Sequence, residues 1–582
     1  MTTETPVLIV GGGPVGLTLA AELGWRGQAC MLIEERTAPT DHPKATLLGA
    51  RSMEYFRRWG ITDAIYAAAI PEDTPYSITF STRLTGHLLH RVVSPSITQT
   101  RRPTPELLAK VRELGWSPYY KTQIGQQALE PVLWKFAEQQ PALQMRHGWK
   151  LAGFSEDAGG VTARIVEVAS GQEQTVRAQY LAACDGGASM VRKGLGIRYN
   201  GRGQMRANVS FYFRSSEFLT CHGLGLANLY FVFTPDSFGV FTAIDGRDRW
   251  LFQYYFLDET RKTEDLDAKD VLTRALGREF DFTLEATQHW HHHQSVARTW
   301  RSRPGHPKSS DGAGGRVFLA GDAAHLFVPT GGVGMNTGVG DAIDLAWKLH
   351  ATLAGWGGAA LLDSYEAERK PVAVRNSVIS ANNSDKIDMV MDETPADIER
   401  DGPEGDRLRA ELAGKIRWMS RQFSSAGTHL GYRYVDSPIV AADGTPEPPD
   451  DFTQVVPSTW PGSRAPHAWI REGAHAGKST LDVFGRGFTL LVLGQDAEAL
   501  ARQSGITTAA AKAGVPLEQV TLTDPAVCAL YATKLVLVRP DGHVAWRGNT
   551  VPADADALIA KVRGAAPVQA PVPAKVAAKV TA

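Results

Sequence analysis

The feature that most constrains the fold is a glycine-rich turn between two short apolar runs near the start of the chain. The first run, Val7–Val10, is rich in β-branched side chains, as in a buried parallel strand. Residues 17–23 then favour a helix, and the second run, Cys30–Ile33, ends at Glu34. The turn holds three glycines at the spacing GxGxxG: Gly11, Gly13 and Gly16. This order predicts a βαβ unit with the glycines in its first turn.

A βαβ unit of this kind predicts dinucleotide binding. Gly11 permits the tight turn, Gly13 lets the backbone approach a pyrophosphate, and Gly16 lets helix and strand pack closely. The helix that begins at Pro14 and Val15 offers free N–H groups and a partial positive charge to the phosphates.

The acid at the end of the second strand is a candidate ribose ligand. A carboxylate at Glu34 can accept hydrogen bonds from a ribose diol. Glu35 competes for this role, although strand alternation points its side chain the other way. The first forty residues do not distinguish NAD from FAD.

A second glycine motif, about 300 residues downstream, favours FAD. An apolar strand ends at Gly321 and Asp322, where an acid suits a polyol such as the ribityl chain. The glycine-rich stretch 328–336 then leads into a helix at 341–349. A helix N-terminus there places N–H donors beside an electron-rich ring and stabilises its negative charge.

Together these motifs resemble the class A flavoprotein monooxygenases, the group of para-hydroxybenzoate hydroxylase and phenol hydroxylase. Three motifs of that family occur in order: the GxGxxG turn, a DG motif at Asp185 and Gly186, and a GD motif at Gly321 and Asp322. They extend over about the first 380 residues. The resemblance implies an FAD-binding oxidoreductase.

Further site residues follow from this resemblance alone. Lys44 matches a basic position, often arginine, at the flavin phosphates or ribose, and Gln126 matches a glutamine that contacts the cofactor. Pro329 matches a proline whose carbonyl lies close to the reacting substrate. The remaining cofactor-binding candidates lie in the glycine-rich loop and the first turn after it: Gly332, Gly334, Met335 and Asn336.

The reaction that the resemblance implies is hydroxylation of a small aromatic, phenolic substrate with dioxygen through a flavin hydroperoxide. No second GxGxxG unit occurs, so NADPH or NADH is expected to dock transiently on the flavin domain. One alternative is a tailoring oxygenase of a polyketide or alkaloid, including Baeyer–Villiger or decarboxylating oxidation. A flavin dehydrogenase and an FAD-stabilised binding protein remain as further alternatives.

Residues 196–295 are expected to form an antiparallel sheet that covers the flavin. Four aromatic and β-branched runs are separated by turns, and Asp245-Gly246 is a typical hairpin turn. A phenol must share or lose its proton to react, and five side chains here are unranked candidates for steering it. They are Tyr212, Arg214, His222, Tyr230 and Tyr254.

The segment His289–His293 places three histidines on one face of a strand. The nearest acid is Glu285, no cysteine is close in sequence, and flavin chemistry needs no metal. A partly exposed strand is the better interpretation, and no metal site is predicted.

The expected fold class is α/β, with a Rossmann-type FAD-binding domain interleaved with an antiparallel substrate sheet and a C-terminal thioredoxin-like α/β domain. That last domain lacks CxxC, so a structural or dimerisation role in a homodimer is expected. The expected boundaries are residues 1–195 and 296–385 for FAD binding, 196–295 for the substrate sheet, 386–455 for a linker or helical excursion, 456–564 for the thioredoxin-like domain and 565–582 for a disordered tail.

Composition excludes several other classes of protein. The 582 residues are too many for one hydrophobic core, and the net charge of −1 argues against a nucleic-acid partner. No apolar run is long enough for a membrane span, and no leader peptide is evident. The four scattered cysteines fit the reducing cytoplasm.

Overall fold

The protein divides into two compact units, which we describe separately. The computed structural model describes residues 2–255, 265–309 and 314–565, so the tail expected at 565–582 lies, apart from Ala565, outside the described residues. Unit 1 comprises residues 1–346, 370–432 and 449–456, and unit 2 comprises residues 347–369, 433–448 and 457–582.

The first sheet of unit 1 contains the predicted βαβ unit. Its order is β7-β2-β1-β10-β9-β8, with β16 also pairing β10. Strands β7, β2, β1, β10 and β16 run parallel, whereas β9 and β8 add an antiparallel meander. The strands are β1 (Thr2–Val10), β2 (Cys30–Glu34), β7 (Leu143–His147), β8 (Trp149–Asp157), β9 (Gly160–Glu167), β10 (Glu173–Ala183) and β16 (Val317–Leu319).

The second sheet of unit 1 has the order β17-β15-β11-β14-β13-β12-β4-β5. It contains the four strands expected within 196–295, and also β4 and β5 from much earlier in the chain. The sheet therefore also includes strands from before residue 196. The strands are β4 (Tyr76–Ser81), β5 (Leu88–Ser94), β11 (Tyr199–Arg214), β12 (Leu229–Val232), β13 (Gly239–Ala243), β14 (Arg249–Tyr255), β15 (Thr283–Ala297) and β17 (His325–Leu326). A two-stranded ribbon pairs β3 (Leu47–Leu48) with β6 (Thr122–Gln123).

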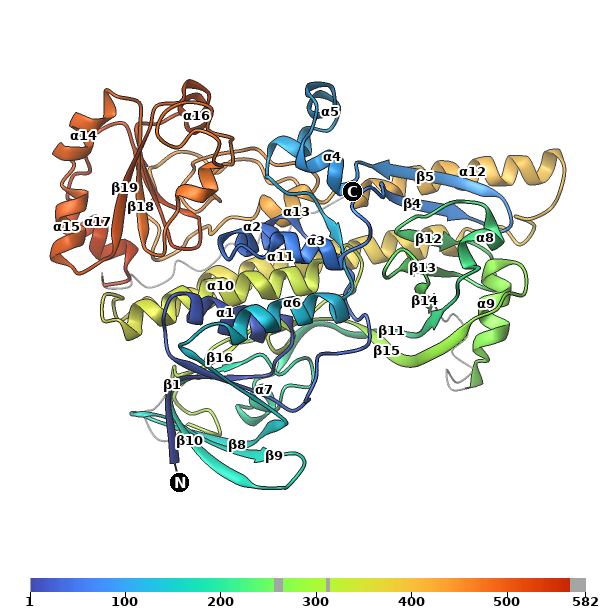
Figure 1. The fold of residues 1–582 in the computed structure, drawn as a ribbon, viewed down its shortest axis with the longest axis horizontal. Coiled ribbons are helices and arrows are strands. Elements are labelled where there is room, and N and C mark those ends of the chain that lie inside the picture. Colours follow the sequence, from blue (N-terminus) through green and yellow to red (C-terminus); the bar gives the residue numbers. More distant parts are fainter. Residues whose placement is uncertain (1, 256–264, 310–313, 566–582) are drawn as a thin grey trace. The chain divides into compact units, whose positions relative to one another are not determined.

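Helices pack against both sheets of unit 1. The neighbours α1 and α6 lie side by side, and α12 lies along β5 (Figure 1). Helices α10 and α11 contain residues of both units. The helices are α1 (Pro14–Trp25), α2 (Ala50–Arg58), α3 (Thr62–Ala68), α4 (Ile97–Arg101), α5 (Pro105–Lys110), α6 (Gln126–Glu138), α7 (Met190–Gly194), α8 (Phe218–His222), α9 (Ala268–Leu276), α10 (Val333–Leu353), α11 (Asp363–Asp392), α12 (Pro403–Met419) and α13 (Ala426–Leu430).

Unit 2 is built on a four-stranded sheet with the order β19-β18-β20-β21. The β18–β19 pair is parallel and the other two pairs are antiparallel. One apolar core lies between this sheet, its helices, the end of α10 and the segment that follows α10, and it includes Trp347, Leu361 and Phe488. The elements are β18 (Phe488–Leu493), β19 (Leu517–Leu522), β20 (Leu535–Val538), β21 (Val544–Gly548), α14 (Ala497–Gln503), α15 (Ile506–Lys512), α16 (Pro525–Tyr531) and α17 (Ala555–Val562).

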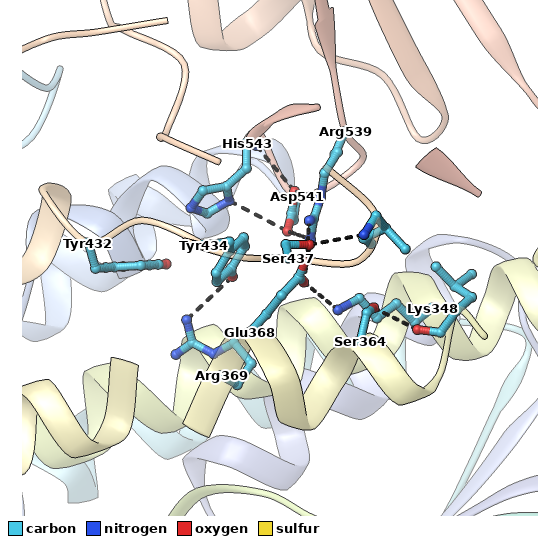
Figure 2. Close-up of polar contacts among 12 residues, drawn as sticks. Lys348, Ser364, Glu368, Arg369, Tyr432, Tyr434, Ser437, Arg539, Asp541 and His543 are labelled. Atoms are coloured by element: carbon cyan, nitrogen blue, oxygen red, sulfur yellow. Dashed lines mark hydrogen bonds and ion pairs between the residues drawn. The ribbon is translucent and has the colours of Figure 1, made fainter. Parts of the chain in front are cut away.

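A cluster of buried charges lies within unit 2 (Figure 2). The carboxylate of Glu368 on α11 meets the ammonium of Lys348 on α10 and the guanidinium of Arg539, which follows β20. Ser437 donates a hydrogen bond to the same carboxylate, and Asp541 pairs with Arg539. Two cations thus meet two carboxylates, so the cluster can be buried without an uncompensated charge.

Candidate functional site

A cavity of about 760 Å³ lies within unit 1. The GxGxxG turn, the ends of β1 and β2, the DG and GD motifs and the glycine loop before α10 line one part of it. Strands of the second sheet line the other part. Segments far apart in the sequence therefore converge on one space.

The GxGxxG turn is packed too tightly for side chains at two of its glycines. Gly11 has a φ of +102°, and a Cβ there would lie 2.4 Å from the carbonyl oxygen of Cys184. A Cβ at Gly16 would lie 1.9 Å from the Gly11 carbonyl oxygen. Gly13 differs, because a Cβ there would meet no atom within 4 Å. Gly13 therefore keeps space open at the cavity rather than permitting a close contact within the protein.

The N-terminus of α1 is suited to an anion. Gly13 is its N-cap, no side chain caps the helix, and its first turn holds no acidic residue. Pro14 and Val15 of that turn line the cavity. The free N–H groups and the helix dipole can therefore act on a phosphate.

Glu34 lies at the end of β2, beside this turn. Its carboxylate accepts hydrogen bonds from the Gly12 backbone N–H at 2.5 Å and from the Arg36 side chain at 2.9 Å. Glu34 and Glu35 both line the cavity, and Glu34 is the more buried of the two. Their positions leave both acids as candidates for the ribose, with Glu34 held in a fixed orientation.

Asp185 of the DG motif carries an unsatisfied oxygen. One carboxylate oxygen accepts from the Val191 N–H at 3.2 Å, whereas the buried Oδ1 finds no hydrogen-bond partner among the described residues. Burial raises the pKa of this carboxyl. Because Asp185 lines the cavity, a ligand hydroxyl or N–H there would satisfy the free oxygen.

The GD turn is fixed to α10 by a buried histidine–aspartate pair. His325 Nε2 lies 2.7 Å from Asp341 Oδ2, and the same oxygen accepts from the Gly321 N–H at 3.2 Å. The adjacent Asp322 lines the cavity. Burial raises the pKa of Asp322, against the opposing charges of His325 and Lys44. Gly321 itself does not line the cavity but has a φ of +59°, which lets the chain turn there.

The loop before α10 is held by Asn336. Its side chain accepts from the Gly49 N–H at 2.8 Å and donates to the Leu47 and Gly332 carbonyls at 3.0 and 2.7 Å. Gly332, Gly334 and Met335 line the cavity, whereas Asn336 does not. The structure thus gives the Asn336 side chain a role in positioning the loop.

Two other predicted cofactor contacts also reach the cavity. Lys44 lines it and is exposed, and Gln126 lines it at the start of α6. The Gln126 amide donates to Glu130 at 2.7 Å, and its backbone N–H donates to the Ala45 carbonyl. This contact joins α6 to the segment that carries Lys44.

These features fit FAD as a bound group. The cavity offers an uncapped helix N-terminus, an open glycine, an unsatisfied carboxylate oxygen and a second acid at a glycine turn. The sequence profile of the FAD binding domain family matches residues 4–378, and that of the aromatic-ring hydroxylase C-terminal domain matches residues 458–566. The chain belongs to the class A flavin monooxygenases. FAD is its cofactor, and the family implies NAD(P)H as the reductant.

Similar proteins include fungal and bacterial monooxygenases. The FAD-dependent monooxygenase apdD of Emericella nidulans is 32% identical over 96% of this chain and 90% of its own. The 4-methyl-5-nitrocatechol 5-monooxygenase of a Burkholderia species is 32% identical over 96% of both chains.

Solved structures extend the similarity to the whole fold. The rebeccamycin biosynthetic enzyme RebC with reduced flavin is 37% identical, with a TM-score of 0.84 over 97% of this chain and all of that one. Aklavinone-11 hydroxylase with FAD and aklavinone is 30% identical, with a TM-score of 0.77 over 96% and 99% of the two chains. The expected α/β fold with a substrate sheet and a C-terminal α/β domain is confirmed.

The second sheet of this flavin monooxygenase turns one face toward the cavity. Side chains alternate between the faces of a strand, and every second residue of three neighbouring strands lines the cavity. They are Leu229 and Phe231 on β12, Val240 and Thr242 on β13, and Leu251, Gln253 and Tyr255 on β14. The result is a largely apolar wall.

Strand alternation also explains where several substrate candidates lie. Tyr254 and Tyr230 occupy the opposite phase on β14 and β12, so they pack in the core on the other face of the sheet. The Tyr230 hydroxyl donates to the Gly225 carbonyl there. Neither side chain lines the cavity.

The other three candidates also lie outside the cavity lining. The buried Tyr212 hydroxyl accepts from Arg249 at 3.0 Å, and the exposed Arg214 pairs with Asp248 at 2.8 Å. His222 lies between aromatic rings, and burial lowers its pKa to about 4. Of the candidates for substrate contact, Pro329 alone lines the cavity.

Sequence reasoning missed polar residues that do line the cavity. Lys121 and Tyr76 lie early in the chain, and Gln422 lies in the segment 386–455, expected as a linker or helical excursion. That segment contains α12, α13 and the 3-10 helix Ser420–Phe423, and part of it walls the cavity. No motif marks these residues, because they reach the site through packing between distant segments.

The histidine-rich strand β15 is partly exposed, as expected. His289 and His291 are exposed, while His292 is buried beside Trp290. Among the described residues, no group of three or more His, Cys, Asp or Glu side chains is arranged to hold a metal ion. None of the described helices combines the length and apolar character needed to cross a membrane.

Proposed function

We propose that this FAD-dependent monooxygenase hydroxylates a flat, fused-ring aromatic substrate with phenolic character, as in the tailoring of a polyketide or alkaloid. The observation that carries this proposal is the broad apolar wall formed by alternating residues of β12, β13 and β14. A planar ring system can lie along such a wall and bury both its rings and the wall from water.

The chain's own residues bind, orient and shield the substrate. The wall residues Phe231, Val240 and Leu251 exclude water, while Gln253 and Thr242 supply hydrogen-bonding groups on the same face. FAD, once reduced by a nicotinamide, supplies the activation of dioxygen. Gly13, Asp185 and Asp322 are the residues proposed to hold it, and Pro329 is proposed to lie beside the reacting ring. The protein therefore orients the substrate relative to FAD and excludes water from it.

Relatives support the fused-ring class and also a second candidate. One similar structure holds aklavinone, and RebC acts in the biosynthesis of rebeccamycin. A single-ring catechol is the second candidate, because the Burkholderia relative is named for 4-methyl-5-nitrocatechol.

The test is oxygen incorporation by the purified holoenzyme. We would measure NADH and NADPH oxidation with the fused-ring phenol alizarin, with aklavinone and with 4-nitrocatechol, under ¹⁸O₂. We expect a fused-ring product that gains one labelled oxygen with its ring skeleton intact. A ring-expanded lactone would instead indicate Baeyer–Villiger oxidation. Nicotinamide oxidation that yields only hydrogen peroxide with every compound would overturn the proposal.

A further inference from the structure

A lysine side chain lies in the lining of the cavity. Lys121 lines the cavity immediately before β6, and β6 pairs with β3. Leu47 of β3 lies against the glycine loop, since a Cβ on Gly332 would come within 2.6 Å of it. Lys121 therefore lies next to a strand whose partner strand packs against the glycine loop, which is proposed to face the flavin ring.

The ammonium of Lys121 is held in a defined place. It donates to the Phe423 carbonyl at 3.0 Å and lies 4.4 Å from the centroid of the Tyr76 ring. The carbonyl and the aromatic face both favour a positive charge. No other hydrogen bond of this ammonium occurs among the described residues, so two of its three N–H donors remain for a ligand.

A neutral hydrogen-bonding side chain lies next in the chain to the residue whose carbonyl binds this ammonium. Gln422 precedes Phe423 in the chain and also lines the cavity. Its amide oxygen and amide nitrogen are both buried, and neither has a hydrogen-bond partner in the part of the chain that the structure describes. A buried amide without partners is costly, so this side chain is arranged for a polar ligand atom.

We propose that Lys121 and Gln422 form a subsite that binds an ionised phenolic oxygen of the aromatic substrate. This inference rests on the proposed function and adds to it the chemical state of the substrate. A bound phenolate is more electron-rich than a phenol and is the better acceptor of an electrophilic oxygen. None of the five side chains predicted to steer the phenol is placed to do this, because none of them lines the cavity.

The proton balance is simple. Burial lowers the pKa of Lys121 to about 8, against the opposing charge of Glu113. At a pH below this value Lys121 is already an ammonium, so a phenol that binds as its phenolate releases one proton to the solvent, and the ammonium balances the charge of the phenolate. The titratable groups around Lys121 are Glu113, Tyr76, Tyr120 and His429. Burial raises the pKa of Tyr76, so its hydroxyl stays neutral beside the ammonium. Burial also raises the pKa of Glu113, against the opposing charge of Lys121.

The test is the spectrum of alizarin bound to the oxidised holoenzyme. Ionisation of alizarin changes its visible absorption, so a titration reports both its affinity and its charge. At a pH where free alizarin is neutral, we expect the wild type to bind the anion. Lys121→Met should bind alizarin at least about 10-fold more weakly and in the neutral form, whereas Lys121→Arg should retain the anionic spectrum. Gln422→Leu should weaken binding without changing the ionisation state.

Two controls separate this subsite from a structural role. 1,2-Dimethoxyanthraquinone has the same rings but no ionisable hydroxyl, so Lys121→Met should bind it as the wild type does. Lys135→Met removes an exposed lysine on α6 and should leave the alizarin spectrum unchanged.

The possible failures are distinguishable. Neutral alizarin on the wild type, or the anionic spectrum on Lys121→Met, overturns the subsite and leaves the proposed function intact. If Lys121→Met weakens the binding of alizarin and of 1,2-dimethoxyanthraquinone equally, the subsite is also overturned, since that result indicates a packing role for Lys121. If the wild type binds no fused-ring phenol at all, both the subsite and the proposed function are overturned.

Discussion

The Arg539 guanidinium donates to both carboxylate oxygens of Glu368, at 2.5 and 2.9 Å, and both side chains are completely buried. Arg539 follows β20, whereas Glu368 lies on α11, 171 positions earlier in the chain. The bidentate geometry gives direction as well as attraction. This pair therefore fixes the sheet of unit 2 against the helix segment that belongs to the same unit.

Replacing Glu368 by glutamine should destabilise unit 2. The substitution keeps the shape but leaves Arg539 and Lys348 without their shared carboxylate, and breaking one partner of a buried pair costs about 3–5 kcal/mol. Native-state hydrogen exchange of peptides across β20 should show a corresponding loss of protection.

An exposed ion pair in the same unit provides the matched control. Lys512 and Asp556 lie 2.9 Å apart, and both are largely solvent-exposed. Asp556→Asn should leave exchange across β20 unchanged. Equal hydrogen-exchange rates across β20 in Glu368→Gln and the wild type would show that the buried Glu368–Arg539 pair does not stabilise the sheet.

Unit 2 should lose stability in acid through the same carboxylates. Burial alone would raise the pKa of Glu368, but Arg539 and Lys348 outweigh it and hold the pKa below its usual range. Burial also opposes the charges of Arg539 and His543 at Asp541, and there too the pKa is lowered. A lowered pKa in the folded state gives stability that is present above the unfolded pKa and lost as the pH falls.

The effect of acid can be measured as the dependence of the urea unfolding midpoint on pH. Urea unfolding of the wild type should show a constant midpoint above about pH 5 and a falling one below about pH 4. Glu368→Gln should show a shallower fall, because it no longer has this carboxylate to protonate. If the midpoints of the wild type and Glu368→Gln fall in parallel with pH, protonation of Glu368 does not contribute to the loss of stability in acid.

Gly13 should matter for the cofactor and not for the fold. A Cβ there meets no protein atom within 4 Å, and its φ of −73° suits any residue. Gly13→Val should therefore fold, but its side chain would project into the space proposed for the pyrophosphate. We expect the FAD content after purification, measured from flavin absorbance, to fall at least about 10-fold.

Gly115 offers the control for that substitution, because a Cβ there also meets nothing within 4 Å and the position does not line the cavity. Gly115→Val should keep the wild-type flavin content. Full flavin occupancy in Gly13→Val would exclude the proposed position of the pyrophosphate.

Asp322 should hold FAD through its carboxylate. Asp322→Ala removes the acid at the GD turn and leaves the His325–Asp341 pair that fixes the turn. We expect weaker FAD retention with unchanged thermal stability of the apoprotein. Normal flavin occupancy in this variant would count against a ribityl contact.

Local motifs predict most of the residues that line the part of the cavity proposed for the cofactor. Gly11, Gly13 and Asp322 lie within short stretches in which strand, turn and helix follow one another, so periodicity and glycine spacing predict where they lie. Most of the predicted cofactor residues line one cavity. The Asn336 side chain bonds three backbone groups and does not line the cavity, while a contact of its backbone N–H with the flavin stays a prediction.

The substrate half was not predictable to the residue. The sequence indicates the strands, but which face of β12 or β14 meets the cavity depends on the packing of the other face against α9 and its neighbours. Tyr254 and Tyr255 carry the same side chain, and one step along the strand places one in the core and the other in the cavity lining. Lys121 and Gln422 line the same cavity only because segments 301 positions apart in the chain fold together.

The width of the substrate wall should determine which substrates bind. Val240 lies on the cavity face of β13, between Phe231 of β12 and Gln253 of β14. Val240→Phe adds volume where a fused ring would lie, and a tight pocket discriminates such changes by about 10- to 200-fold. We expect the Kd of alizarin to rise by at least about 10-fold and that of 4-nitrocatechol to change by less than about 3-fold. Val168→Phe, at an exposed position, should change neither. If the two ligands weaken equally, the added side chain has disturbed the whole cavity, and the wall does not select ring number.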